Sequence, residues 1–198
     1  MGAATKNSAG LFCLRIELED LTPAIWRRVW VDDRSSLSAL HHTIQAAMGW
    51  TDAHLHEFRI GDVIYAIPHP EDDPERAIVD ERRARLRKAL DGISMFSYQY
   101  DFGDSWQHTI TVEKRAPMPQ HWLGCAFVEA CERACPPEDS GGPSGYQTFL
   151  DQLGDNPKHT EVRKFKQWAG KGFDPRKFDR HAANAALSRM AWNRWGDT

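Results

Sequence analysis

The chain has 198 residues, a formal net charge of −3 and 41% hydrophobic residues, among them eight Trp and nine Phe. A chain of this length buries roughly 70% of its unfolded surface, so it needs neither disulfides nor a structural metal to fold. No run approaches the ~20 apolar residues of a membrane span, and no apolar signal segment follows the start. We therefore expect a soluble, cytoplasmic protein with no membrane partner.

The first predicted elements form a β-hairpin. Residues 11–18 and 24–31 each alternate apolar and polar side chains, and the segment 19–23 between them is typical of a turn. Arg27 falls on the more aliphatic face of the second strand. It is either a buried or ligand-facing charge or a residue at a strand end.

A helix is predicted next, because apolar residues recur at three- and four-residue steps over residues 37–48. Ser35 or Ser36 can cap its first turn, and Gly49 can end it. Two strands should follow the helix, over residues 54–60 and 63–67, separated by a turn at Gly61 and Asp62.

The rest of the chain alternates helical and extended patterns. A helix is predicted over residues 78–90, followed by a β-hairpin with arms at 95–101 and 106–114. Residues 116–143 are expected to be irregular because Pro and Gly interrupt them. Three helices are predicted to close the chain, over residues 144–153, 160–169 and 175–192.

These elements predict the α+β class, with a mainly antiparallel sheet built from hairpins, helices packed on one side and a helical C-terminal segment. We expect residues 1–10 to be disordered and residues 11–198 to form a single domain. From residue 158 onward the chain has ten Lys or Arg against four Asp or Glu. Residues 157–198 are therefore interpreted as a basic helical segment that packs on an acidic body or binds a polyanion.

Four cysteines are spaced unlike any zinc motif, since the last three follow a C-x5-C-x3-C pattern. We expect reduced, mostly structural thiols. Cys135 precedes two prolines and shows no activating environment for a nucleophile. The four are Cys13, Cys125, Cys131 and Cys135.

Three short polar-aromatic blocks are the strongest functional signal: residues 50–58, 101–108 and 135–143, here called the first, second and third block. Each joins turn-forming residues to His, Asp or Glu beside a segment patterned for burial. Polar groups near a core must be paired, so the blocks are either satisfied structural joints or a binding site. The predicted ligand-binding residues are Trp50, His54, His56, Asp101, Asp104, Trp106, His108, Glu138 and Asp139.

The histidines raise the possibility of a metal. His54 and His56 would share the apolar face of one strand, and His108 would lie on the apolar face of another strand of the same sheet. The three imidazoles could hold a divalent ion such as zinc, with Asp101, Asp104 or Glu138 completing the ligand set. The alternative is that each histidine hydrogen-bonds to a turn at the end of the sheet.

The second block also has an interpretation as turn chemistry. Gly103 would supply a positive φ, while Asp101 and Asp104 would cap free backbone N–H groups.

Five segments together resemble a known family, the plasmid pRiA4b ORF-3-like family, over roughly residues 11–178. They are residues 23–28, 44–50, 54–58, 98–108 and 135–139. The chain departs from the family at Ser140, where the family usually carries a second cysteine, which argues against a cysteine-pair role through Cys135. The resemblance implies an α+β domain of unsettled biochemical function, some of whose relatives carry a label linking them to insertion-element passenger or resolvase-like proteins. We find neither the activated serine with clustered arginines nor the helix-turn-helix pattern that a serine recombinase needs.

Three functional hypotheses follow. The first is a binding or adaptor domain whose blocks form a polar-aromatic cleft for a small ligand, a peptide or a protein partner. The second is a divalent-metal-dependent hydrolase with Glu138 or Asp139 as general base. The third is nucleic-acid association through the basic C-terminal helices. The sequence holds no complete catalytic signature.

Overall fold

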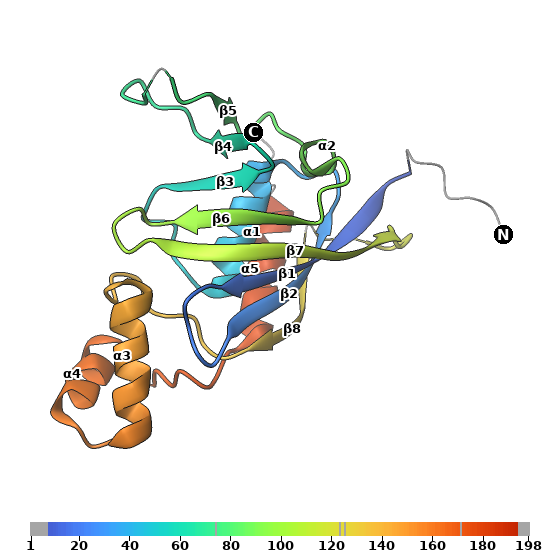
Figure 1. Ribbon diagram of the computed structural model, residues 1–198. Coiled ribbons are helices and arrows are strands. Elements are labelled where there is room, and N and C mark those ends of the chain that lie inside the picture. Colours follow the sequence, from blue (N-terminus) through green and yellow to red (C-terminus); the bar gives the residue numbers. More distant parts are fainter. Residues whose placement is uncertain (1–7, 74, 123, 125, 171, 194–198) are drawn as a thin grey trace.

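A computed structural model of the chain describes residues 8–73, 75–122, 124, 126–170 and 172–193. Its strands are β1 (Gly10–Leu18), β2 (Ile25–Asp32), β3 (His56–Ile60), β4 (Val63–Ala66), β5 (Ile78–Asp80), β6 (Met95–Tyr100), β7 (Trp106–Pro117) and β8 (Ala126–Glu132). Its helices are α1 (Leu37–Met48), α2 (Leu86–Leu90), α3 (Gly142–Asp155), α4 (Thr160–Trp168) and α5 (Arg180–Asn193). The strands form one sheet in the order β5-β4-β3-β6-β7-β1-β2-β8 (Figure 1). All neighbouring strands are antiparallel except β4 and β5, which confirms the α+β class.

Helices α1 and α5 lie side by side on one face of the sheet, and α3 and α4 form a separate helical pair beside one end of it (Figure 1). The core lies between the sheet and α1 with α5. Alternate residues of the central strands enter this core, as period-2 geometry requires. In β1 these residues are Phe12, Leu14, Ile16 and Leu18.

Helix α1 begins and ends where its sequence predicts. The Ser36 side chain accepts a hydrogen bond from the Ala39 N–H at 3.0 Å, which satisfies one of the free donors of the first turn. Gly49 takes the left-handed conformation at φ 94°, and its N–H donates to the Gln45 carbonyl at 2.8 Å.

The helix predicted over residues 78–90 is wrong. Its first residues form β5, which pairs in parallel with β4, and only Leu86–Leu90 is helical. The backbone between them bonds to distant partners, since the Glu81 N–H donates to the Ala66 carbonyl at 3.1 Å and the Ala84 carbonyl accepts from the Leu37 N–H at 3.0 Å. Tertiary hydrogen bonds thus replace the local bonds of a helix.

The prediction of an irregular segment over residues 116–143 misses a strand. β8 pairs with β2 at the edge of the sheet. Helix α5 provides hydrogen-bond partners for the backbone of β8. The Asn184 side-chain amide donates to the Val128 carbonyl at 3.1 Å and accepts from the Val128 N–H at 2.8 Å. Because a remote helix stabilises this strand, the alternation of apolar and polar residues along it is weak.

Residues 8–10 already form backbone contacts with the rest of the fold. Gly10 belongs to β1, and the Ser8 carbonyl accepts hydrogen bonds from Arg87 at 3.2 Å and Arg115 at 2.6 Å. Residues 1–7 of the segment predicted to be disordered lie outside the described residues. In the part of the chain that is described, no helix combines the length and apolar character needed to span a bilayer.

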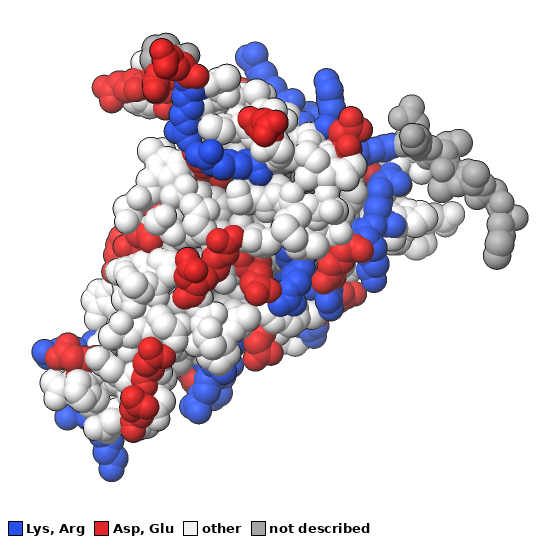
Figure 2. All heavy atoms as spheres, in the orientation of Figure 1, with Lys and Arg blue, Asp and Glu red and all other residues white. Residues whose placement is uncertain are grey.

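The sheet face opposite α1 and α5 shows basic and acidic side chains intermixed over a largely uncharged surface (Figure 2). Arg28 pairs with Glu113 at 2.6 Å, and Lys114 lies over the Trp30 ring at 4.9 Å. Such mixed charge provides no extended basic surface on this face for a polyanion.

Candidate functional site

The three blocks meet at one end of the sheet, where β3 begins, β6 ends and β7 begins. The Trp50 indole N–H donates to the Pro136 carbonyl at 3.0 Å, joining the first block to the third. The Gly141 N–H donates to the Asp104 carboxylate at 3.2 Å, joining the third to the second. Segments about 90 residues apart in the chain therefore form one junction.

Glu138 is the central acceptor of this junction. Its Oε1 accepts hydrogen bonds from the Thr51 N–H at 3.1 Å and the Tyr100 hydroxyl at 2.6 Å, and its Oε2 accepts from the Thr51 hydroxyl. Burial raises the pKa of Glu138, but these hydrogen bonds outweigh it and the net pKa is lowered. An ionised carboxylate with both oxygens engaged is a poor general base, so Glu138 acts as a clamp between the blocks.

The Glu138→Gln variant is expected to lower the free energy of unfolding by about 1–3 kcal/mol at pH 7, because it weakens charge-assisted hydrogen bonds. The depressed pKa means that this contribution is complete above about pH 4.5, the ordinary value, and is lost as the pH falls through the lower folded-state value. Urea unfolding at several pH values would measure the difference between the two proteins. A difference that stays constant down to pH 3 would contradict the clamp.

The second block is an aspartate-capped turn. Asp101 Oδ1 accepts from the N–H groups of Gly103 at 3.0 Å and Asp104 at 3.3 Å, as predicted for Asp101. The positive φ values fall on Asp101 and Ser105, both at 57°, and not on Gly103, so that prediction is corrected. An aspartate whose side chain bonds two residues onward tolerates the left-handed conformation, and glycine is not needed there. The Asp104 carboxylate also accepts a hydrogen bond from a free backbone group, the Gly141 N–H in the third block.

The three histidines do not converge on one point, which corrects the proposed ligand set. His54 precedes β3, with its Nε2 atom 3.7 Å from Asp101 Oδ2 and 3.5 Å from Asp139 Oδ1. His56 lies inside β3 and is buried, with Nε2 2.9 Å from the Glu81 carboxylate. The predicted strand start at residue 54 is two residues early, and this difference separates the two imidazoles.

His108 and Trp106 lie in the core. His108 Nδ1 donates to the carbonyls of Tyr98 at 3.2 Å and Trp106 at 3.1 Å, and burial lowers the pKa of His108 to about 4. Both side chains are fully buried and pack near Trp50. Direct contact of His108 or Trp106 with a ligand would require the core to open.

A buried hydrogen-bond chain runs from the core to the first block. The Asp52 N–H donates to Gln45 Oε1 at 3.1 Å, which identifies the oxygen of the Gln45 amide. The amide nitrogen, Gln45 Nε2, therefore faces the Tyr98 hydroxyl and donates to it, also at 3.1 Å. The Tyr98 hydroxyl then donates to His41 Nδ1 at 2.8 Å, which leaves the proton of His41 on Nε2, facing Asp52 Oδ1 at 2.7 Å. Burial lowers the pKa of His41, consistent with this neutral form.

His41 is thus a site residue that the sequence analysis missed, as are Gln45 and Tyr98. Their signal was present in the sequence. His41 and Gln45 occur at four-residue steps from Leu37 on the buried face of α1, where a polar residue requires a partner. The His41 ring also stacks on the His56 ring, with centroids 3.4 Å apart.

An open cleft of about 770 Å³ lies between α1 and α5 beside the first block, and is called the α1–α5 cleft here. Trp50, Thr51 and Asp52 come from the first block and line it. Its other lining residues come from the two helices: His42, Gln45, Ala46, Ala186, Arg189, Met190 and Asn193.

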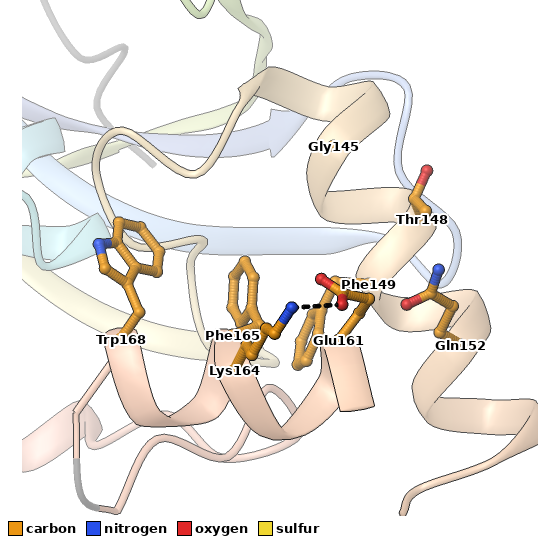
Figure 3. Close-up of a pocket in the computed structure, with 8 residues that line it drawn as sticks. All are labelled: Gly145, Thr148, Phe149, Gln152, Glu161, Lys164, Phe165 and Trp168. Carbon is orange, nitrogen blue, oxygen red and sulfur yellow. Dashed lines mark hydrogen bonds and ion pairs between the residues drawn. The ribbon is translucent and has the colours of Figure 1, made fainter. Parts of the chain in front are cut away.

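A smaller hollow of about 400 Å³ lies between α3 and α4 (Figure 3). Phe149, Phe165 and Trp168 line it, and the Lys164–Glu161 ion pair of 2.8 Å crosses its edge. None of its lining residues belongs to the three blocks or to the predicted ligand-binding set. Of these two hollows, the α1–α5 cleft is the one that block residues line.

The cysteines fit the expectation of free thiols. Within the described residues, Cys13, Cys131 and Cys135 are unbonded, and Cys125 lies outside that part of the chain. Burial raises the pKa of Cys13 to about 11 and that of Cys135 to about 12. Neither thiol is activated as a nucleophile at neutral pH.

Comparison with known proteins places these features in a family. The model of the family described as "Plasmid pRiA4b ORF-3-like protein" matches residues 11–182. The uncharacterized protein y4hQ of Sinorhizobium fredii is 41% identical over 180 residues, covering 89% of this chain and 87% of that protein. The crystal structure of the protein of unknown function MM3350 from Methanosarcina mazei Go1 has a TM-score of 0.78 and 33% identity, covering 90% of this chain and 98% of that one. Neither description names an activity.

Proposed function

Because the chain belongs to the plasmid pRiA4b ORF-3-like family, whose matched relatives carry no described activity, we propose from its own geometry that it binds a small organic anion in the α1–α5 cleft. The observation that carries the proposal is a cleft of ligand size next to the first block, with Arg189 on its wall and no ion-pair partner for it among the residues that the structure describes.

The size and lining of the cleft suit a small molecule. Its volume of about 770 Å³ lies within the range of roughly 300–1,000 Å³ that is usual for ligand pockets. Trp50, Met190 and Ala186 provide apolar surface, while the Asn193 amide provides hydrogen-bonding groups. A ligand with an aromatic or aliphatic body and a few polar atoms matches this lining.

The charges of the cleft favour an anion. Asp52 lines it, but its two oxygens are occupied within the protein, since Oδ1 accepts a hydrogen bond from His41 at 2.7 Å and Oδ2 lies 3.3 Å from His42. Arg189, on α5, has no ion-pair partner among the described residues. A carboxylate, sulfonate or phosphate of the ligand would complete that pair.

The floor of the cleft is held in place before any ligand arrives. Thr51 is bonded to Glu138 through its backbone and its hydroxyl, and the Asp52 N–H is bonded to Gln45. A wall fixed by such bonds loses little conformational entropy on binding. The junction of the three blocks thus fixes the segment of the first block that lines the cleft.

The cleft-filling variant Ala186→Trp is expected to weaken binding of anilinonaphthalene sulfonate, an aromatic anion that fits the lining, by more than about 10-fold. Ala185→Trp adds the same side chain to an exposed position one residue away and should leave binding unchanged. Arg189→Gln should weaken binding about 3–10-fold by removing the cation. Fluorescence titration measures all three.

Equal affinity of Ala185→Trp and Ala186→Trp for this probe would contradict the proposal. Binding that survives Ala186→Trp but is lost in 1 M salt would instead indicate a surface interaction with the basic helices. The basic residues there are partly neutralised, since Lys164 pairs with Glu161 and Arg176 with Asp174.

A further inference from the structure

We propose that His54, Asp101 and Asp139 bind a divalent transition-metal ion, with zinc as the best fit. Each residue comes from a different block, and one ligand atom of each lies within 4.8 Å of the other two. This metal site is separate from the anion cleft and does not depend on it, although the loop that carries Thr51 and Asp52 also carries His54.

The distances within the cluster are longer than those of hydrogen bonds and leave room for an ion between the ligand atoms. His54 Nε2 lies 3.7 Å from Asp101 Oδ2 and 3.5 Å from Asp139 Oδ1. Both distances exceed the 2.7–3.2 Å typical of N–H···O bonds. Tetrahedral zinc, bonded at about 2.0–2.2 Å, separates its ligand atoms by about 3.4 Å. The two separations from His54 therefore match a coordination sphere, and the third, between the two carboxylates, is within 4.8 Å.

Asp101 provides a second, independent indication. Its side chain is only 10% exposed, and its Oδ1 atom is held by the N–H groups of Gly103 and Asp104. Within the described residues, Oδ2 receives no hydrogen bond and points toward His54 Nε2. A carboxylate whose side chain is nine-tenths buried, with one oxygen lacking a donor, is stabilised by a cation beside that oxygen.

The other two ligands suit their roles. The His54 and Tyr100 rings pack in a T-shaped arrangement, with centroids 5.7 Å apart, which restrains the orientation of His54. Asp139 is 74% exposed and leaves the site open to solvent on one side. Three protein ligands with an open position are the arrangement of catalytic and exchangeable zinc sites.

A second cluster, His41, His42 and Asp52, is equally compact but is a poorer metal site. The hydrogen-bond chain from Gln45 through Tyr98 places the His41 proton on Nε2, the atom that would have to ligate. Metal binding there would move this proton to Nδ1 and leave the buried Tyr98 hydroxyl without an acceptor. Its atoms are already at hydrogen-bonding distance, with 2.7 Å between His41 and Asp52.

The donor set selects the kind of metal. One imidazole nitrogen and two carboxylate oxygens suit zinc or manganese, whereas calcium and magnesium prefer oxygen ligands alone. The tetrahedral spacing favours zinc over the larger, six-coordinate manganese ion.

Calorimetric titration of chelator-treated full-length protein with zinc chloride tests the site. We expect about one zinc ion per chain, with affinity lowered more than about 100-fold in His54→Gln and in Asp139→Asn. His181→Gln, an exposed histidine on α5 outside both clusters, serves as the matched control and should bind as the unaltered chain does. Cobalt substitution should give visible absorption bands of tetrahedral intensity that disappear in Asp139→Asn.

Zinc binding that persists in His54→Gln and Asp139→Asn would overturn the proposal, as would a lack of binding at millimolar zinc. Loss of binding in His42→Gln with retention in His54→Gln would assign the metal to the second cluster instead. Asp139 is exposed, so its variant should fold, and urea unfolding of each variant confirms this. Binding of anilinonaphthalene sulfonate reports separately on the anion cleft.

Discussion

Replacing Gly142 with alanine is expected to lower the free energy of unfolding by about 2–4 kcal/mol, whereas the same change at Gly154 should raise it by about 0.5–1 kcal/mol. Both glycines belong to α3. A Cβ at Gly142 would lie 2.5 Å from the Asp104 carbonyl oxygen, and its φ of 68° is strained for alanine. At Gly154 a Cβ meets no atom within 4 Å.

The measurement is urea unfolding of the two variants beside the unaltered chain. The pair is informative because the residue change and the helix are the same, so the difference reports the contact with the second block. If Gly142→Ala is as stable as Gly154→Ala, then α3 does not pack on the turn at Asp104 as described. Gly142→Ala should also weaken zinc binding, because that turn carries Asp101.

Arg27→Lys is expected to cost about 3 kcal/mol or more, and Arg27→Met to cost less. Arg27 is fully buried, with its Nε donating to the Ala47 carbonyl and its Nη1 to the carbonyls of Trp26 and Glu132. Its guanidinium lies 3.7 Å above the Phe178 ring. Lysine keeps the buried charge but cannot match this fork of donors, whereas methionine removes the charge.

The two variants should also differ in their pH dependence. Burial lowers the pKa of Arg27, and it would lower that of a lysine there below its ordinary value of about 10.4. The folded lysine variant then loses its proton first, so its stability should rise as the pH increases toward 10, relative to Arg27→Met. A lysine variant as stable as the unaltered chain at pH 7 would show that charge alone, and not the geometry of the donors, is needed at this position.

The sequence analysis was most reliable where the decisive forces are local. The cap at Ser36, the end of α1 at Gly49 and the Asp101 turn each depend on residues within a few positions. The hairpins were predicted for the same reason, since alternation along a strand directly records its buried face.

It failed where a remote segment supplies the hydrogen bonds. The residues that were predicted to extend a helix from 78 instead pair with β4, and β8 exists because β2 and Asn184 bind its backbone. His54 was expected to share a face with His56, but the strand begins two residues later. Periodicity records what a segment can do by itself and does not record which distant backbone it meets.

The candidate site shows the same division. The blocks were recognised from their composition. Composition could not show that Arg189 and Trp50 line one cleft, or that Glu138 accepts hydrogen bonds from Thr51 and Tyr100. It also could not separate accessible residues from buried ones, so Trp106 and His108 were grouped with His54.

By itself, the sequence determined the α+β class, the local turns and caps, and the residues in which polar chemistry is concentrated, because each of these depends on neighbours along the chain. Only the tertiary structure decided that the three blocks meet, that His54 lies beside Asp101 and Asp139, and that α5 forms a wall of the cleft. These contacts join residues far apart in the chain, and their geometry follows from how the sheet and helices pack together.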